Sequence, residues 1–144
     1  MITSFIDTAI RPAREAVVRS HMEAECHHDI AATLQTFAEP NYDVVPLGAP
    51  SNGEAAVEEL LDGLFAAFPD FDAKELSLHH GDDIVFVDTQ ITGTHRGPWA
   101  GVPATGRRME VRCGCIFHFD GVRLVKETVF FDHATLLAQI GVQG

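Results

Sequence analysis

Apolar residues recur at helical spacing in residues 54–68, and this segment is the clearest helix that the sequence predicts. Its apolar stripe consists of Val57, Leu60, Leu61, Leu64, Phe65 and Phe68. The acidic residues Glu58, Glu59 and Asp62 lie mostly away from that stripe, as they do on a helix that packs one face against a core. Pro69 ends the helix.

Two further helices are predicted earlier in the chain. Residues 14–26 have a mixed helical face, and Pro12 suits the first turn of that helix. A second helix spans residues 30–37, with Asp29 as its N-cap. Pro40 marks its end.

The rest of the chain is typical of strands. Residues 42–47 form a short strand, and residues 48–53 form a loop rich in Pro, Ser, Asn and Gly. Four longer strands follow the helix at 54–68, at residues 73–80, 84–93, 107–119 and 122–131. Asp120-Gly121 is the pair that a two-residue hairpin prefers, and a short helix at 134–140 closes the chain.

This order of elements predicts an α+β protein in which helices cover one face of a curved antiparallel sheet. Residues 1–144 form a single domain, because the length fits one core. A curved sheet wrapped around one long helix leaves a cone with an open mouth, and such a mouth favours a small-molecule pocket.

The composition excludes several classes of protein. The formal net charge is -11, and the ten basic residues form no stripe, so we expect no nucleic-acid partner. No apolar run is long enough to span a bilayer, no basic and apolar leader begins the chain, and acidity disfavours anionic membranes. Cys113 and Cys115 lie on one strand face and Cys26 makes the count odd, which favours reduced thiols in a cytoplasmic protein. We expect no metal site, because no Cys or His set has zinc-ligand spacing.

Several motifs resemble those of one family. The stretch from Gly93 to Arg107 has the pattern Gly-Thr-His-x-Gly followed by Gly-x-Pro-x-Thr-Gly-Arg. The other matching features are Ala67-Phe68-Pro69-Asp70-Phe71, Gly81-Asp82, Asp120-Gly121, Glu127, and Asp132 followed by Leu136-Leu137-x-Gln139-x-Gly141. Together they resemble the SnoaL-like polyketide cyclase family of the nuclear transport factor two-like superfamily, over about residues 9–141.

The resemblance implies a cone-shaped α+β barrel and a cofactor-independent reaction. In family members that are true cyclases, an Asp at the position of Asp132 is the general acid/base, and a His lies where this chain has His118. Two departures alter the expected pocket lining. Many relatives carry Trp in place of Thr128, and residues 46–49 differ from the usual His-Asp-like segment.

Both candidate catalytic residues have a structural alternative. Asp132 follows the apolar segment 129–131, so it is either a general acid/base in a cleft or the cap of the helix beginning near Ala134. His118 either polarises a carbonyl and positions Asp132, or it is a hydrogen-bonded structural group on its strand.

The expected pocket is aromatic. Its candidate lining residues are Tyr42, Phe65, Phe68, Trp99 and Phe130, each of which is alternatively an ordinary core residue. Trp99 lies in the long loop after the second long strand, where it covers the pocket mouth or packs on a partner subunit.

The leading functional hypothesis is an enzyme that binds a hydrophobic carbonyl or ester compound and closes a ring by an aldol-type step, as an ester cyclase does. A lyase, isomerase or hydrolase reaction in the same pocket is an alternative. So are a non-catalytic small-molecule-binding module and a structural dimerisation domain. We also expect a homodimer, or a dimer of dimers, through the outer sheet face carrying Val85, Val87 and Ile91 or their alternates.

Overall fold

The computed structural model describes residues 3–142, with side chains described from residue 9 onward. Its elements in chain order are α1 (Thr3–Cys26), α2 (Ile30–Gln35), β1 (Asn41–Val44), the 3-10 turn η1 (Val45–Leu47), β2 (Pro50–Asn52), α3 (Glu54–Ala67), β3 (Asp72–His80), β4 (Ile84–Thr94), β5 (Arg108–Asp120), β6 (Arg123–Phe131) and α4 (His133–Gln139).

The strands form one curved, unclosed sheet in the order β2-β1-β6-β5-β4-β3. Strands β3 to β6 pair as an antiparallel meander, whereas β1 pairs with β6 in parallel. The α+β prediction is therefore confirmed, but the sheet is mixed and not antiparallel throughout. The parallel pair arises because α2 carries the chain back to the start of β6, where Phe37 bridges Leu124 and leads into β1.

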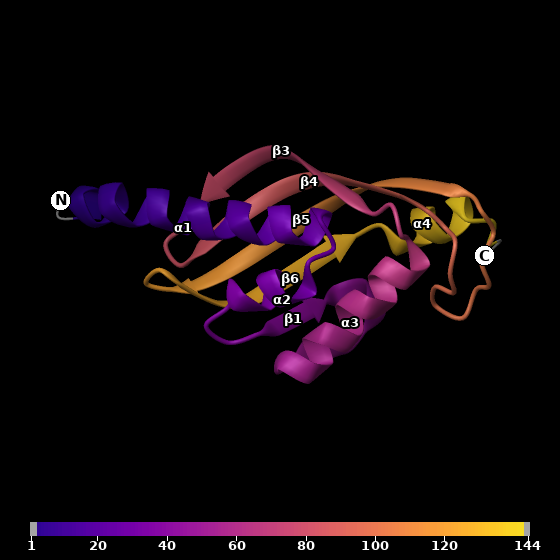
Figure 1. Cartoon of the computed structure of the whole chain (residues 1–144). Coiled ribbons are helices and arrows are strands. Elements are labelled where there is room, and N and C mark those ends of the chain that lie inside the picture. Colours follow the sequence, from indigo (N-terminus) through magenta and orange to yellow (C-terminus); the bar gives the residue numbers. More distant parts are fainter. Residues whose placement is uncertain (1–2, 143–144) are drawn as a thin grey trace.

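Helices cover the concave face of the sheet (Figure 1), and alternation along the strands decides which side chains lie beneath them. The buried residues are the odd-numbered ones in both β4, from Val85 to Gly93, and β5, from Met109 to Phe119. The prediction left open whether the outer face carries Val85, Val87 and Ile91 or their alternates, and the burial of these three residues excludes them from that face. Their alternates, including Ile84 and Phe86, occupy that face.

Helix α1 begins at Thr3, well before the predicted start, so Pro12 lies inside the helix and not in its first turn. The buried Arg14 fastens α1 to both hairpin turns at one end of the sheet. Its Nε donates to the Gly121 carbonyl at 2.7 Å, and its Nη1 donates to the Asp82 carbonyl at 2.8 Å. The guanidinium also lies 5.4 Å from the ring centre of Phe119.

Other boundaries follow local chemistry. Asp29 caps α2 as predicted, because its side chain accepts from the Ala32 N–H. The expected loop at 48–53 contains the edge strand β2, which a run of Pro, Ser and Asn did not predict. Cys113 and Cys115 are buried and unbridged, as is the half-buried Cys26. None of the helices in the described part of the chain is both long and apolar enough to cross a bilayer.

Candidate functional site

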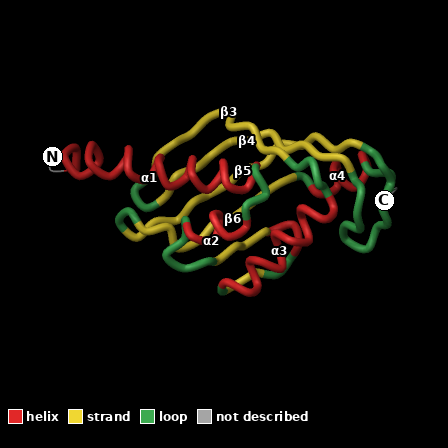
Figure 2. The backbone as a smooth tube through the Cα atoms, in the orientation of Figure 1, coloured by secondary structure: helices red, strands yellow, loops and turns green. Residues whose placement is uncertain are grey.

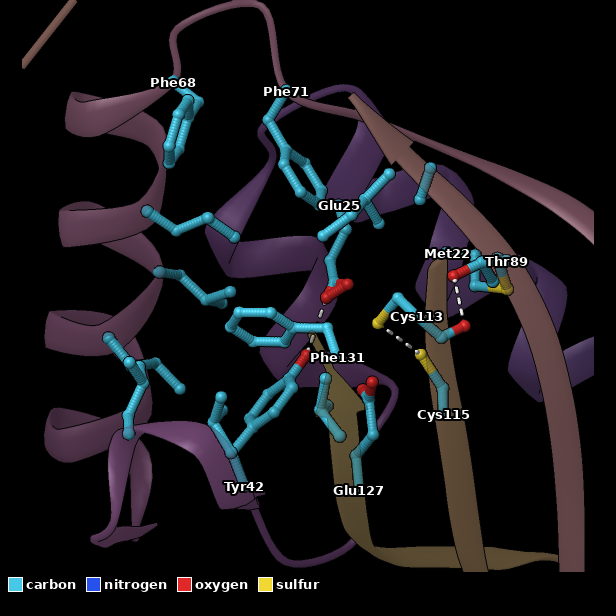
Figure 3. A pocket seen from close by; sticks show the side chains of 18 of the residues that line it. Met22, Glu25, Tyr42, Phe68, Phe71, Thr89, Cys113, Cys115, Glu127 and Phe131 are labelled. Atoms are coloured by element: carbon cyan, nitrogen blue, oxygen red, sulfur yellow. Dashed lines mark hydrogen bonds between the residues drawn. The ribbon is translucent and has the colours of Figure 1, made fainter. Parts of the chain in front are cut away.

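An apolar pocket of ≈ 90 Å³ lies between the concave face of the sheet and the helices (Figure 3). Its walls are aliphatic and aromatic, and include Phe68 and Phe71 at one end and Phe131 from β6. No Lys or Arg lies among its lining residues. An apolar cavity with a few converging polar groups is the usual form of a small-molecule site.

Two carboxylates and one phenol supply most of the polarity of this pocket. Glu25 comes from α1, Tyr42 from β1 and Glu127 from β6. Tyr42 and Glu127 are register partners on the parallel strands, which brings their side chains to the same face. The Tyr42 hydroxyl donates to Glu25 Oε2 at 2.8 Å, and Figure 3 shows the Glu25 carboxylate reaching toward that hydroxyl.

His21 lies behind these groups and contacts all three. Its Nε2 is 2.7 Å from Glu127 Oε1, 3.4 Å from Glu25 Oε2 and 2.8 Å from the Tyr42 hydroxyl oxygen. The contact with Glu127 is an ion pair that falls short of well-aligned hydrogen-bond geometry. The side chain of His21 is wholly buried, and that of Glu127 is 3% exposed, whereas that of Glu25 is 15% exposed.

The other ring nitrogen of His21 has a fixed role. The Thr36 hydroxyl donates to the Thr33 carbonyl at 2.6 Å, so its oxygen accepts from His21 Nδ1 at 2.8 Å. A proton is therefore held on Nδ1, and Nε2 carries the proton that titrates. In this way the short helix α2 orients the imidazole from outside the pocket.

Burial and charge act in opposite directions on this cluster. Burial alone lowers the pKa of His21, but the adjacent Glu25 and Glu127 carboxylates outweigh it and raise that pKa to about 10. Burial, and then repulsion from Glu25, raise the pKa of Glu127 above its usual range despite His21. Burial also holds the pKa of Tyr42 well above its usual value, so the phenol stays a neutral donor.

The same cluster has the composition of a metal site. His21, Glu25 and Glu127 each offer one ligand atom, and these three atoms lie within 4.8 Å of one another. Among the described residues, no other group of three or more His, Cys, Asp or Glu side chains is arranged in this way. A metal would need Nε2 deprotonated, and it would therefore displace the proton that the two carboxylates stabilise there. The spacing of Cys and His in the sequence predicted no metal site. That spacing did not identify this cluster, because Glu127 comes from a different element than His21 and Glu25.

Asp132 is the N-cap of α4. Its carboxylate accepts from the Thr135 backbone N–H at 3.0 Å and from the Thr135 hydroxyl at 2.6 Å. These hydrogen bonds lower the pKa of Asp132, and the side chain is exposed. Asp132 does not line the pocket. The structure therefore shows the capping alternative, and the catalytic role stays a prediction that no contact supports.

His118 lies on the outer face of β5, away from the pocket. Its Nε2 pairs with Thr128 Oγ1 at 2.8 Å, and burial together with Lys126 lowers its pKa. The structure does not bring His118 and Asp132 together at the pocket. Thr128, at a position where the family often has Trp, contacts His118 on the outer face and does not line the pocket.

The five predicted lining residues divide into two groups. Tyr42, Phe68 and Trp99 line the pocket. Phe65 instead stacks on His28 with ring centres 4.2 Å apart, and Phe130 is 46% exposed on the outer face of the sheet. The Phe130 prediction is wrong because alternation along β6 sends Glu127, Val129 and Phe131 inward.

Two signals in the sequence could have indicated the cluster. His21 and Glu25 are separated by four residues and so share one helix face. Glu127 stands among apolar residues of a buried strand, at a period of two from Val129 and Phe131. Neither signal names the partner, because Tyr42 joins the cluster only through the parallel pairing of β1 with β6.

Comparison with known proteins places this architecture in a family. The sequence profile of the SnoaL-like polyketide cyclases matches residues 15–140, which spans every element of the pocket. The chain belongs to the SnoaL-like polyketide cyclase family. The resemblance in its motifs is thereby confirmed, and so is the fold that it implied.

Several solved structures share the whole fold. IdmH from Streptomyces antibioticus, provisionally assigned as a polyketide cyclase, is 23% identical, with a TM-score of 0.75 over 90% of this chain and 99% of that one. A provisionally assigned polyketide cyclase from Acidithiobacillus ferrooxidans is 28% identical, with a TM-score of 0.72 over 89% and 93% of the two chains. A protein from Catenulispora acidiphila with a ketosteroid isomerase-like fold, solved with trimethylamine, is 16% identical, with a TM-score of 0.76 over 88% and 93%.

The search of curated proteins gives no match. The family and the fold are therefore shown by the profile and by the solved structures.

Proposed function

We propose that this SnoaL-like protein catalyses an acid/base reaction, of the aldol ring-closing type, on a hydrophobic carbonyl or ester compound. The observation that carries the proposal is the pair of carboxylates in an apolar pocket that holds no basic lining residue. Pairs of carboxylates in unlike environments divide the roles of acid and base. The polyketide cyclase assignments of its relatives favour the same reaction class.

Glu25 is the proposed general base. Both carboxylates line the pocket, the side chain of Glu25 is the more solvent-exposed of the two, and the Tyr42 hydroxyl donates to one of its oxygens at 2.8 Å. The carboxylate takes a proton from the carbon next to a carbonyl group, and the C–H electron pair becomes the enolate. General acid/base catalysis of this kind contributes about 10²–10⁴-fold in rate.

Glu127 and Tyr42 are the proposed proton donors. Burial raises the pKa of Glu127, which makes this carboxyl group easier to protonate than an ordinary one, and Tyr42 stays neutral. The enolate carbon attacks a second carbonyl carbon, a carbon–carbon bond forms, and the new alkoxide takes a proton from this side of the pocket. Glu25 then passes the proton that it took from carbon to whichever of Tyr42 and Glu127 donated, so every group returns to its starting state and no cofactor is needed. His21 stabilises the carboxylate pair from behind, because its Nε2 contacts both.

Deuterium exchange at carbon tests this proposal without the natural substrate. α-Tetralone is an apolar ketone, and NMR in D₂O follows the loss of its protons next to the carbonyl. We expect the wild type to accelerate exchange by about 10²-fold or more over buffer, and Glu25→Gln to remove that acceleration. Asp132→Asn is the control, because Asn also caps helices and Asp132 lies outside the pocket.

The outcomes separate the rival roles. Exchange that survives Glu25→Gln but is lost in Asp132→Asn would contradict the proposal and restore Asp132 as the base. Tetralone that binds without any exchange would favour the second candidate, a binding module. The observation behind that candidate is that Tyr42, His21 and the two carboxylates already contact one another, as in a satisfied structural cluster.

A further inference from the structure

The loop between β4 and β5 carries the one tryptophan of the sequence, Trp99, and brings it to the pocket lining. Figure 2 shows this loop and α4 at the same end of the molecule. Trp99 is half-buried, whereas its neighbours Pro98 and Ala100 are exposed. The indole therefore extends from an exposed loop and forms part of the cavity wall.

The base of this loop is fastened firmly. The His95 N–H donates to the Arg107 carbonyl at 2.8 Å, which closes the loop at its root. The backbone N–H groups of Arg96 and Gly97 both donate to the Ala67 carbonyl at the end of α3. A Cβ at Gly97 would collide with the carbonyl oxygen of Ala66, so only glycine allows this close approach.

The tip of the loop is held differently. Trp99 and Val102 exchange two backbone hydrogen bonds of 3.0 and 2.8 Å, which close a tight turn through Ala100 and Gly101. Both turn residues have positive φ, 48° and 79°. These bonds shape the tip, but they do not attach it to the rest of the molecule.

The Trp99 side chain supplies the side-chain hydrogen bond of that attachment, and Trp99 and Val102 both pack against the core. Its Nε1 donates to Nε2 of His133, the first residue of α4, at 3.1 Å. The indole ring also lies 5.5 Å from the Phe68 ring and 6.1 Å from the His133 ring, centre to centre. Among the described residues, the Trp99–His133 bond is the one hydrogen bond between residues 98–104 and α4.

The direction of this bond defines the state of His133. An indole N–H is a donor only, so Nε2 of His133 must offer its lone pair and the ring must be neutral. Protonation of Nε2 would place two donors face to face and break the bond. We propose that Trp99 is a movable wall of the pocket and that His133 is its latch, which holds the indole in place when neutral and releases it when protonated.

The direction of the pH effect follows from the surroundings of His133. Its ring contacts are with Trp99 and Phe131, which carry no charge. The charged or titratable groups around α4 and the loop include Asp132, Glu110 near Gln139, Arg107 near Gly141, and His95, whose ring packs on Phe68. Arg96 lies in the loop itself, and Asp70 and Arg108 lie at its base. Burial lowers the pKa of His133 in the latched state.

Release exposes His133 to water and returns its pKa toward about 6.5. The latched state is therefore favoured fully above about pH 6.5, and it loses stability as the pH falls below that value. Loss of one ordinary hydrogen bond shifts the ratio of latched to released forms by about fivefold. This inference is independent of the proposed catalysis, since a pocket that only binds would have the same latch.

The single tryptophan makes the latch directly observable. Acrylamide, a neutral quencher, is titrated against the fluorescence of the full-length protein between about pH 8 and pH 5. We expect the wild type to become more quenchable and red-shifted as the pH falls. Far-UV circular dichroism at each pH confirms that the molecule stays folded.

Three variants make the test specific. His133→Gln supplies an amide oxygen that accepts from the indole but does not titrate, so we expect low quenching at every pH. His133→Leu has no acceptor, so we expect high quenching even at pH 8. His79→Gln is the matched control, because His79 is exposed and bonds Ser77 at a different part of the sheet. The proposal is overturned if His133→Gln keeps the pH dependence, or if His133→Leu matches the wild type at pH 8.

Discussion

At the scale of single residues, His21 is the group on which the pocket cluster depends. It is wholly buried, and its Nε2 contacts two carboxylates and a phenol that come from three different elements. Leaving a buried charge without its partner costs far more than the pair itself contributes. The local sequence shows an ordinary His and Glu four residues apart, and it says nothing of the second carboxylate.

We predict that His21→Leu destabilises the protein by about 3–5 kcal/mol, because Glu25 and Glu127 would lose the buried imidazole that contacts both of them. Urea unfolding at pH 7 measures the change. The double variant His21→Leu/Glu127→Leu removes one of the two carboxylates as well, so its cost should be smaller than the sum of the single changes. If the unfolding free energy of His21→Leu equalled that of the wild type within experimental error, the proposed stabilising role of His21 would be wrong.

The pH dependence of this stabilisation has a definite sign. The folded pKa of His21 is raised to about 10, above the unfolded value near 6.5. Its contribution is therefore complete below about pH 6.5 and is lost as the pH rises toward 10. The stability gap between the wild type and His21→Leu should narrow over that range.

At the scale of elements, the two short helices depend on their N-terminal caps. Asp29 accepts from the Ala32 N–H, and Asp132 accepts from the Thr135 N–H. Both caps were identifiable from the sequence, because an Asp before an apolar helical repeat is a local signal. The ends of the sheet were less predictable. Strand β2 is three residues long and exists only because β1 offers it an edge.

We predict that Asp132→Ala lowers the melting temperature by a few degrees while tetralone binding is unchanged. Asp132→Asn should restore the melting temperature, since both side chains cap well. The pKa of Asp132 is lower in the folded protein than in the unfolded chain, where it is near 4. The ionised carboxylate therefore stabilises the folded state above about pH 4, and this stabilisation is lost as the pH falls further. If Asp132→Ala lost tetralone binding while its fold stayed intact, Asp132 would have a role in ligand binding, and the assignment as a cap alone would be wrong.

At the scale of the whole molecule, the helices of residues 3–142 lie on the concave side of the sheet (Figure 1) and leave its convex face without a helical layer. Ile116 pairs with Phe86 in register and Gly114 pairs with Phe130, so these residues lie on that face. Phe130 is 46% exposed. We propose that a second copy of the chain covers this face, as an apolar strip on a sheet is costly in water.

Sedimentation velocity at micromolar concentration tests this association. We expect a dimer, or a dimer of dimers, for the wild type, and a monomer for Phe130→Glu. Val122→Glu is the control, because Val122 is equally exposed but lies in the turn between β5 and β6. A monomeric wild type, or a Val122→Glu variant that dissociates as readily, would count against this face.

The sequence by itself determined the helix predicted at 54–68, which the structure ends one residue earlier, the four long strands, the hairpin at Asp120-Gly121, and the family. These features rest on spacing and turn chemistry within short segments, which the chain carries locally. The tertiary structure decided where the chemistry lies. Parallel pairing of β1 with β6 sets Tyr42 beside Glu127, and packing of α1 adds His21 and Glu25. Strand alternation turned His118 and Phe130 outward, because a one-residue difference in register reverses the face of every side chain.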